Sequence, residues 1–142
     1  MRIPCMILIF ILPMLVGCQR THDDTIPSEG AEPFCSIGLM SKSCDYTTVG
    51  LIGFRSELSK EIAISTITEL ISSGEIDGVI LRRSGVKLVR SPSNDHDFTE
   101  LLLSNQTWSF SFELEGIDGF VQIQFENDII RSVIWEYNNF DF

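Results

Sequence analysis

The residues of this chain that could do chemistry are four cysteines and two short clusters of histidine and aspartate. The clusters are His-Asp-Asp at residues 22–24 and Asp-His-Asp at residues 95–97. Both contain metal-ligand types, but consecutive residues seldom converge on one ion. The sequence also lacks the G-x-S-x-G and H-E-x-x-H motifs and a phosphate-binding glycine loop. We therefore expect no catalytic residue, no metal site and no cofactor.

Cys18 ends an apolar segment that begins after Arg2. The segment is about fifteen residues long and contains Pro4 and Pro13, whereas a membrane-spanning helix needs roughly 20 apolar residues. A basic residue, an apolar stretch and a small residue before the break are the layout of an export signal. We expect residues 1–17 to be a signal peptide that is removed.

The tetrapeptide LVGC at residues 15–18 resembles the lipobox of bacterial lipoproteins. This resemblance implies that Cys18 is lipidated on sulfur, that the chain is cut before it, and that the new N-terminus is acylated, for example with palmitate. Several acyl chains anchor a protein stably, whereas one binds a membrane only marginally. Gln19 stands where lipoproteins of the inner membrane usually carry aspartate, which implies the outer membrane of a Gram-negative host. The alternative is an ordinary signal peptide with a coincidental cysteine.

The remaining cysteines predict a disulfide. Cys5 leaves with the signal peptide, so Cys35 and Cys44 form an even pair in an oxidising compartment. A loop of this length gives a stabilisation of about 2.5–3 kcal/mol in the chain-entropy account. The pair lacks C-x-x-C spacing, which argues against redox or zinc chemistry.

The charge of the mature chain indicates which partners suit it. Without residues 1–17 it has 9 basic and 20 acidic residues, a net charge of −11. Such a chain repels nucleic acid and anionic lipid, so a basic protein partner is favoured; acidity that only maintains solubility is the alternative. Residues 18–33 contain the lipidated cysteine and a stretch rich in proline, glycine and acids. They predict a flexible tether before a single domain over residues 34–142.

The domain is predicted to be α+β, with a helix over about residues 56–74 packed on a C-terminal three-stranded antiparallel meander over about residues 108–137. Ser56 or Ser59 can start the helix, and its apolar residues recur at three-and-four spacing. The intervening residues 75–107 are less informative. Their first part fits either a hairpin or a short helix that runs into a strand, and a short helix is expected after it. Arg82, Arg83, Lys87 and Arg90 gather there, either as an anion or partner site or in internal ion pairs.

The meander follows from alternating apolar and polar residues and from two predicted turns, at residues 116–119 and at Asn127-Asp128. These turns pair Phe110 with Phe125, Phe112 with Ile123, Leu114 with Val121, Phe125 with Ile130, and Val121 with Ile134. All these pairs are apolar and share one face, which the helix is expected to cover.

The opposite face of the predicted meander carries the candidate partner-binding residues. They are an apolar cluster beside two acids: Phe120, Val133, Trp135, Tyr137, Glu113 and Glu126. Rigid aromatic side chains rimmed by polar groups are typical interface anchors. The alternative is that residues 79–103 cover this face and make it a second core.

The order of helix and meander, with FENDIIRSV at the second hairpin, resembles small outer-membrane lipoproteins of the SmpA/OmlA type. That resemblance implies a helical layer on a three-stranded sheet and a role in outer-membrane protein assembly. It assigns no functional residue.

We therefore expect a lipoprotein anchored in the outer membrane, facing the periplasm and acting as a non-catalytic protein-binding module. The leading expectation is an inhibitor or immunity protein that masks a basic toxin or cell-wall hydrolase. The alternative is an envelope assembly or scaffold lipoprotein.

Overall fold

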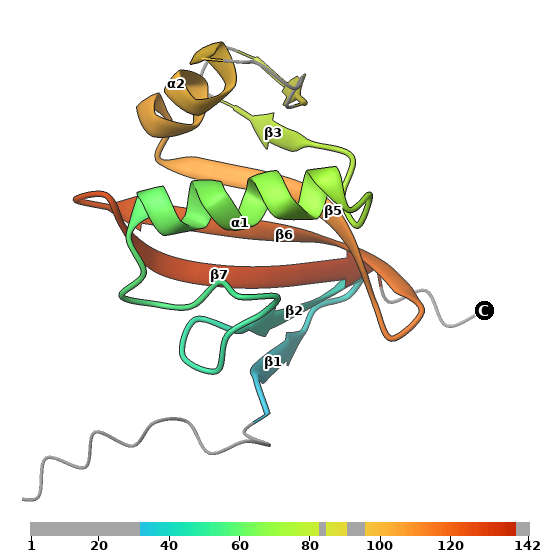
Figure 1. Cartoon of the computed structure of the whole chain (residues 1–142). Helices are drawn as coiled ribbons and strands as arrows, with labels where there is room; N and C mark the ends of the chain where they lie inside the picture. Colours follow the sequence, from blue (N-terminus) through green and yellow to red (C-terminus); the bar gives the residue numbers. More distant parts are fainter. Residues whose placement is uncertain (1–31, 83–84, 91–95, 139–142) are drawn as a thin grey trace, which may run out of the picture.

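The structure is a computed structural model that describes residues 32–82, 85–90 and 96–138 (Figure 1). Their elements are β1 (Phe34–Ile37), β2 (Ser41–Asp45), α1 (Lys60–Ser72), β3 (Val79–Leu81), β4 (Lys87–Val89), α2 (His96–Ser104), β5 (Thr107–Leu114), β6 (Ile117–Glu126) and β7 (Ile129–Asn138). The predicted signal peptide (1–17), lipidation site (Cys18) and all but the last two residues of the tether (18–33) lie outside the described residues.

The strands form a seven-stranded antiparallel sheet in the order β1-β2-β7-β6-β5-β3-β4. The predicted fold class, a helix over about 56–74 packed on a three-stranded meander over about 108–137, is therefore wrong. The three C-terminal strands are only the centre of a larger sheet (Figure 1). The β1–β2 hairpin extends it beside β7, and the β3–β4 hairpin extends it beside β5.

The β1–β2 hairpin contains the disulfide that the cysteine count predicts. Cys35 and Cys44 lie directly opposite each other on the two strands and are bonded. Cys44 is also part of the core, with 3 % of its surface exposed. The predicted disulfide is confirmed, and it joins an edge strand of the sheet to its neighbour.

Helix α1 lies across the central strands on one face of the sheet (Figure 1). It begins where Ser59 accepts a hydrogen bond from the Ile62 amide at 3.4 Å, one of the two predicted starts. After its end, Gly74 adopts a positive φ of 78°, which glycine allows without steric cost. Its buried apolar residues recur at three-and-four spacing, as predicted: Ala63, Ile64, Ile67 and Leu70.

The turn between β5 and β6 is shorter than the predicted loop at residues 116–119. It consists of Glu115 and Gly116 alone, both at positive φ, which is the requirement of a type I′ hairpin turn. Leu114 therefore pairs with Ile117, and the β5–β6 pairing is shifted by four residues from the predicted one. An even shift keeps each side chain on its predicted face.

The β6–β7 pairing begins as predicted and then changes register. Asn127 and Asp128 form the two-residue turn, and Phe125 lies opposite Ile130. The next pair is Gln124 with Ser132, so Arg131 is an extra residue on β7. This is a β-bulge, and it moves the rest of β7 by one position.

The bulge exchanges the two faces of β7 relative to the predicted register. Val121 pairs with Trp135, and the predicted pairing of Val121 with Ile134 is wrong. Val133 and Trp135 belong to the core, with 0 % and 3 % of their surface exposed. A one-residue shift sends every following side chain to the other face of a strand.

Helix α2 packs beside α1 on the core side of the sheet. The indole Nε1 of Trp108, a fully buried residue of β5, donates to the carbonyl of Leu102 at 3.1 Å. The Nζ of Lys60 donates to the carbonyl of Leu103 at 2.9 Å and lies 3.4 Å from Asp128 Oδ1. Lys60 is 1 % exposed, so one buried ammonium joins the start of α1, the end of α2 and the β6–β7 turn.

We expect Lys60→Ala to lower the free energy of unfolding by about 2–4 kcal/mol, because it removes buried methylenes and a charged hydrogen bond. Asp128→Asn should cost less than about 1 kcal/mol, because Asp128 is 73 % exposed and its contact with Lys60 is long. Urea unfolding followed by circular dichroism measures both. Equal losses in the two variants would show that the ion pair, rather than the hydrogen bond to Leu103, holds the helices.

We expect Gly119→Ala to destabilise the fold by about 1–3 kcal/mol through overpacking. A Cβ there would lie 2.6 Å from Trp135 Nε1 and 2.8 Å from the Glu136 carbonyl oxygen. Ser111→Ala, an exposed change on the neighbouring strand, is the control and should change stability by less than about 0.5 kcal/mol. Unchanged stability of Gly119→Ala would place Trp135 away from Gly119 and refute the bulged register.

Candidate functional site

The face of the sheet opposite α1 is the candidate functional surface, because no helix of the described residues lies on it. The strand registers place one row of side chains across all seven strands of this outer face: Phe34, Asp45, Ile134, Gln122, Ser109, Ile80 and Leu88. The row mixes apolar and polar side chains. The predicted alternative, a second core built by residues 79–103, is not seen in the described part of that segment, because β3 and β4 extend the sheet and α2 packs on the core side.

Phe120 stands near the middle of this outer face with 56 % of its surface exposed. It pairs with Ser111 on β5 and with Glu136 on β7. Asp118 lies two residues before Phe120, on the same face of β6, and pairs with Glu113 on β5. We call Phe120, Ser111, Glu113, Asp118 and Glu136 the Phe120 patch. It combines an exposed aromatic ring with three exposed carboxylates.

The carboxylates of the patch are not neutralised within the described part of the chain. Glu113 and Asp118 lie directly opposite each other, an arrangement of like charges that weakens a sheet. The ion pairs within the described ranges join Lys60 to Asp128 and Arg131 to Glu126, outside the patch. The patch is therefore a surface whose charge favours a cationic partner.

The structure separates the six predicted partner-binding residues. Phe120, Glu113 and Glu126 lie on the outer face, whereas Val133, Trp135 and Tyr137 lie on the core face. The predicted aromatic cluster is therefore wrong. The cause is the bulge at Arg131, which the sequence reasoning did not include. Glu126 faces outward but is paired with Arg131 at 3.5 Å.

Tyr137 is half-buried at the edge of the core. Its ring lies 4.5 Å from that of Trp135, and the Lys42 ammonium lies 5.9 Å from its centre. Burial raises the pKa of the neighbouring Tyr46 hydroxyl, and the charges of Glu115 and Tyr137 add to that effect. These groups are accounted for by packing and do not contribute to the outer face.

Two members of the Phe120 patch, Asp118 and Glu136, were missed by sequence reasoning. The predicted loop at residues 116–119 contains Asp118. The predicted register puts Ile134, and with it Glu136, on the face that the helix was expected to cover. The signal that could have found Glu136 is the spacing of three between the apolar residues Ile130 and Val133, which departs from the strand period of two.

The basic cluster lies at the opposite edge of the sheet. Arg82, Lys87 and Arg90 are exposed on and beside the β3–β4 hairpin, and Arg83 lies outside the described residues. None of the ion pairs found in the described ranges involves the first three. The predicted internal pairing is thus not seen there. The basic residues lie on and beside β3 and β4, whereas the acidic patch lies on the central strands β5, β6 and β7.

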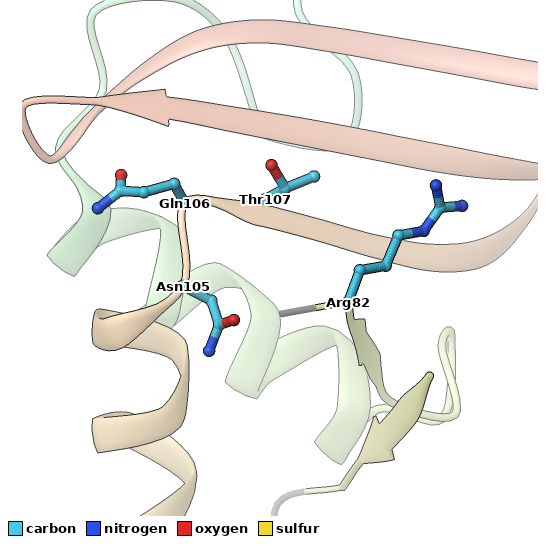
Figure 2. Close-up of a pocket in the computed structure, with 4 residues that line it drawn as sticks. All are labelled: Arg82, Asn105, Gln106 and Thr107. Carbon is cyan, nitrogen blue, oxygen red and sulfur yellow. The ribbon is translucent and has the colours of Figure 1, made fainter. Parts of the chain in front are cut away.

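A surface pocket of about 330 Å³ lies beside this edge and is lined by Arg82, Asn105, Gln106 and Thr107 (Figure 2). Asn105 Nδ2 donates to the Leu101 carbonyl at 2.7 Å and so closes the end of α2. Figure 2 shows that the Gln106 side chain points away from Arg82. The polar groups do not converge on one point, so we assign the pocket no chemistry.

The described residues contain no group of three or more histidine, cysteine or acidic side chains placed to hold a metal ion. Their helices are also too short and too polar to cross a membrane.

No protein-family model, no curated protein and no solved structure matches the chain. The seven-stranded sheet also differs from the three-stranded sheet that the resemblance to SmpA/OmlA lipoproteins implies. The fold expected from that resemblance is therefore wrong.

Proposed function

We propose that this chain is an envelope lipoprotein that works as a non-catalytic protein-binding module. Cys18 anchors it in the outer membrane, and the domain faces the periplasm. Its partner is a basic protein, a toxin or a cell-wall hydrolase, which the chain inhibits by masking its surface. The LVGC tetrapeptide supports the anchor, and the acidic outer face supports the partner class.

The observation that carries this proposal is the Phe120 patch. A phenylalanine that is 56 % exposed at the centre of a sheet face is a large apolar contact area, and aromatic residues are enriched among interface anchors. Glu136 beside it and the facing pair Glu113 and Asp118 supply negative charge. Complementary charge speeds encounter and selects among partners, while the aromatic ring supplies affinity.

An outer face of this kind suits masking better than catalysis. The sheet presents side chains at regular spacing on a broad surface of seven strands, and the Phe120 patch comes from three of them, β5, β6 and β7. The carboxylates of this face are exposed to solvent. A general acid or base usually has its pKa shifted by burial in a hydrophobic pocket, and these carboxylates lack that environment. A broad polar rim around an aromatic anchor is the anatomy of a protein–protein interface.

The experiment is affinity capture from an envelope extract with immobilised chain that carries Cys18→Ser. The parent should retain a basic partner, and Phe120→Ala should weaken its binding by about 2 kcal/mol, roughly 30-fold in Kd. Glu136→Lys should also weaken binding relative to the parent chain at low salt, because the substitution replaces a negative charge with a positive one. Ile62→Ala is the matched control, since Ile62 is 52 % exposed on α1, on the other side of the sheet.

Binding should also fall as salt is added, because exposed charges are screened. Circular dichroism confirms that each variant is folded. If Phe120→Ala and Ile62→Ala bind the captured protein equally well, the patch is not the binding surface. Capture of assembly-machinery components in place of a basic toxin or hydrolase would replace masking by the scaffold function.

A further inference from the structure

The β1–β2 hairpin has an apolar tip with no core to bury it. Of the eleven large hydrophobic side chains exposed among the described residues, four fall within residues 34–40. Three of them form the tip: Ile37, Leu39 and Met40, at 73 %, 104 % and 63 % exposed. We call these three residues the hairpin tip. Contiguous exposed apolar side chains of this kind mark a contact with a partner or a membrane.

The hairpin tip is held rigidly. The Gly38 amide donates to the Ser41 carbonyl at 2.8 Å and closes the turn. Four residue pairs join β1 to β2, and the Cys35–Cys44 disulfide links the strands covalently. The sheet therefore presents these apolar side chains outward in a fixed arrangement, so the tip pays little ordering entropy on contact.

The charge of this segment differs from that of the rest of the chain. Lys42 is the only charged residue from residue 33 to residue 44, although the mature chain has a net charge of −11. An acidic surface is repelled by a bilayer that contains anionic lipid, whereas this segment carries no acid. The tip end of the hairpin is thus electrostatically compatible with a lipid surface, although most of the domain is acidic.

The hairpin also follows the predicted anchor directly. Residues 18–33 separate Cys18 from β1, and a coil of that length spans roughly 20 Å. Insertion of three side chains alone is a weak interaction, as with a single acyl chain. An anchor holds the tip at high local concentration near the bilayer and makes a weak contact effective.

We propose that the hairpin tip inserts into the interface of the bilayer that carries the anchor and so fixes the orientation of the domain. This inference rests on the proposed lipid anchor at Cys18. Edge strand β1 then faces the lipid, and the Phe120 patch, four strands into the sheet, stays in water where a partner can reach it. The tip serves as a second membrane contact beside the lipid.

The test uses the mature chain from Cys18 with Leu39→Trp, coupled through the Cys18 thiol to a maleimide phospholipid in phosphatidylcholine vesicles. Imposed coupling makes the result independent of native lipidation, which the mass of the protein from cells tests separately. When the vesicle lipid is replaced by its brominated form, the tryptophan at position 39 should lose most of its emission. Trp108 and Trp135 are buried and give a constant background.

Val86→Trp is the matched control. Val86 is 84 % exposed in the β3–β4 hairpin at the opposite edge of the sheet, and its tryptophan should keep its emission. Equal emission with brominated and ordinary lipid at position 39 would overturn the proposal. A blue-shifted emission at position 39 before lipid is added would also overturn it, because protein would then cover the tip.

Discussion

The β-bulge at Arg131 is the constraint on which the rest of the structure depends. One extra residue on β7 separates the Phe125–Ile130 pair from the Gln124–Ser132 pair. From that point each side chain of β7 changes face. Val133 and Trp135 therefore complete the core beneath α1, and Glu136 is released to the outer face. Without the bulge, Trp135 would lie outside the core beside Phe120.

The core and the outer surface are consequences of the same register. Gly119 lacks a side chain where Trp135 packs over β6, so the large indole fits against the sheet. The next residue, Phe120, then points outward and meets Glu136 across the strand pair. Because α1 and α2 both pack on the core side, this exposed ring is left beside three carboxylates. The bulge therefore couples the burial of Trp135 to the exposure of Glu136, whereas Phe120, Glu113 and Asp118 lie on the outer face in either register of β7.

Local signals in the sequence predicted local structure correctly. Ser59 caps α1, Asn127-Asp128 turns the second hairpin, and the two domain cysteines are joined, because each depends on neighbouring residues or on a simple count. Strands β1 and β2 were missed, and β3 and β4 were left open between a hairpin and a helix with a strand, because segments of three to five residues are too short to show a period. The bulge was missed because residues 130–135 are apolar at both even and odd positions, so packing against the whole core decides the register. The candidate site was accordingly found only in part, with Phe120 and Glu113 placed correctly and Trp135 not.

Hydroxyl-radical footprinting read by mass spectrometry tests the division of the sheet into a core face and an outer face most directly. The indole of tryptophan is intrinsically more reactive toward hydroxyl radical than the ring of phenylalanine. A lower modification rate at Trp135 than at Phe120 would therefore reflect burial of Trp135. We expect Trp135 to be protected in the folded chain and to become reactive on unfolding, while Phe120 is modified in both states. A reactive Trp135 together with a protected Phe120 in the folded chain would contradict the bulged register and the binding surface built on it.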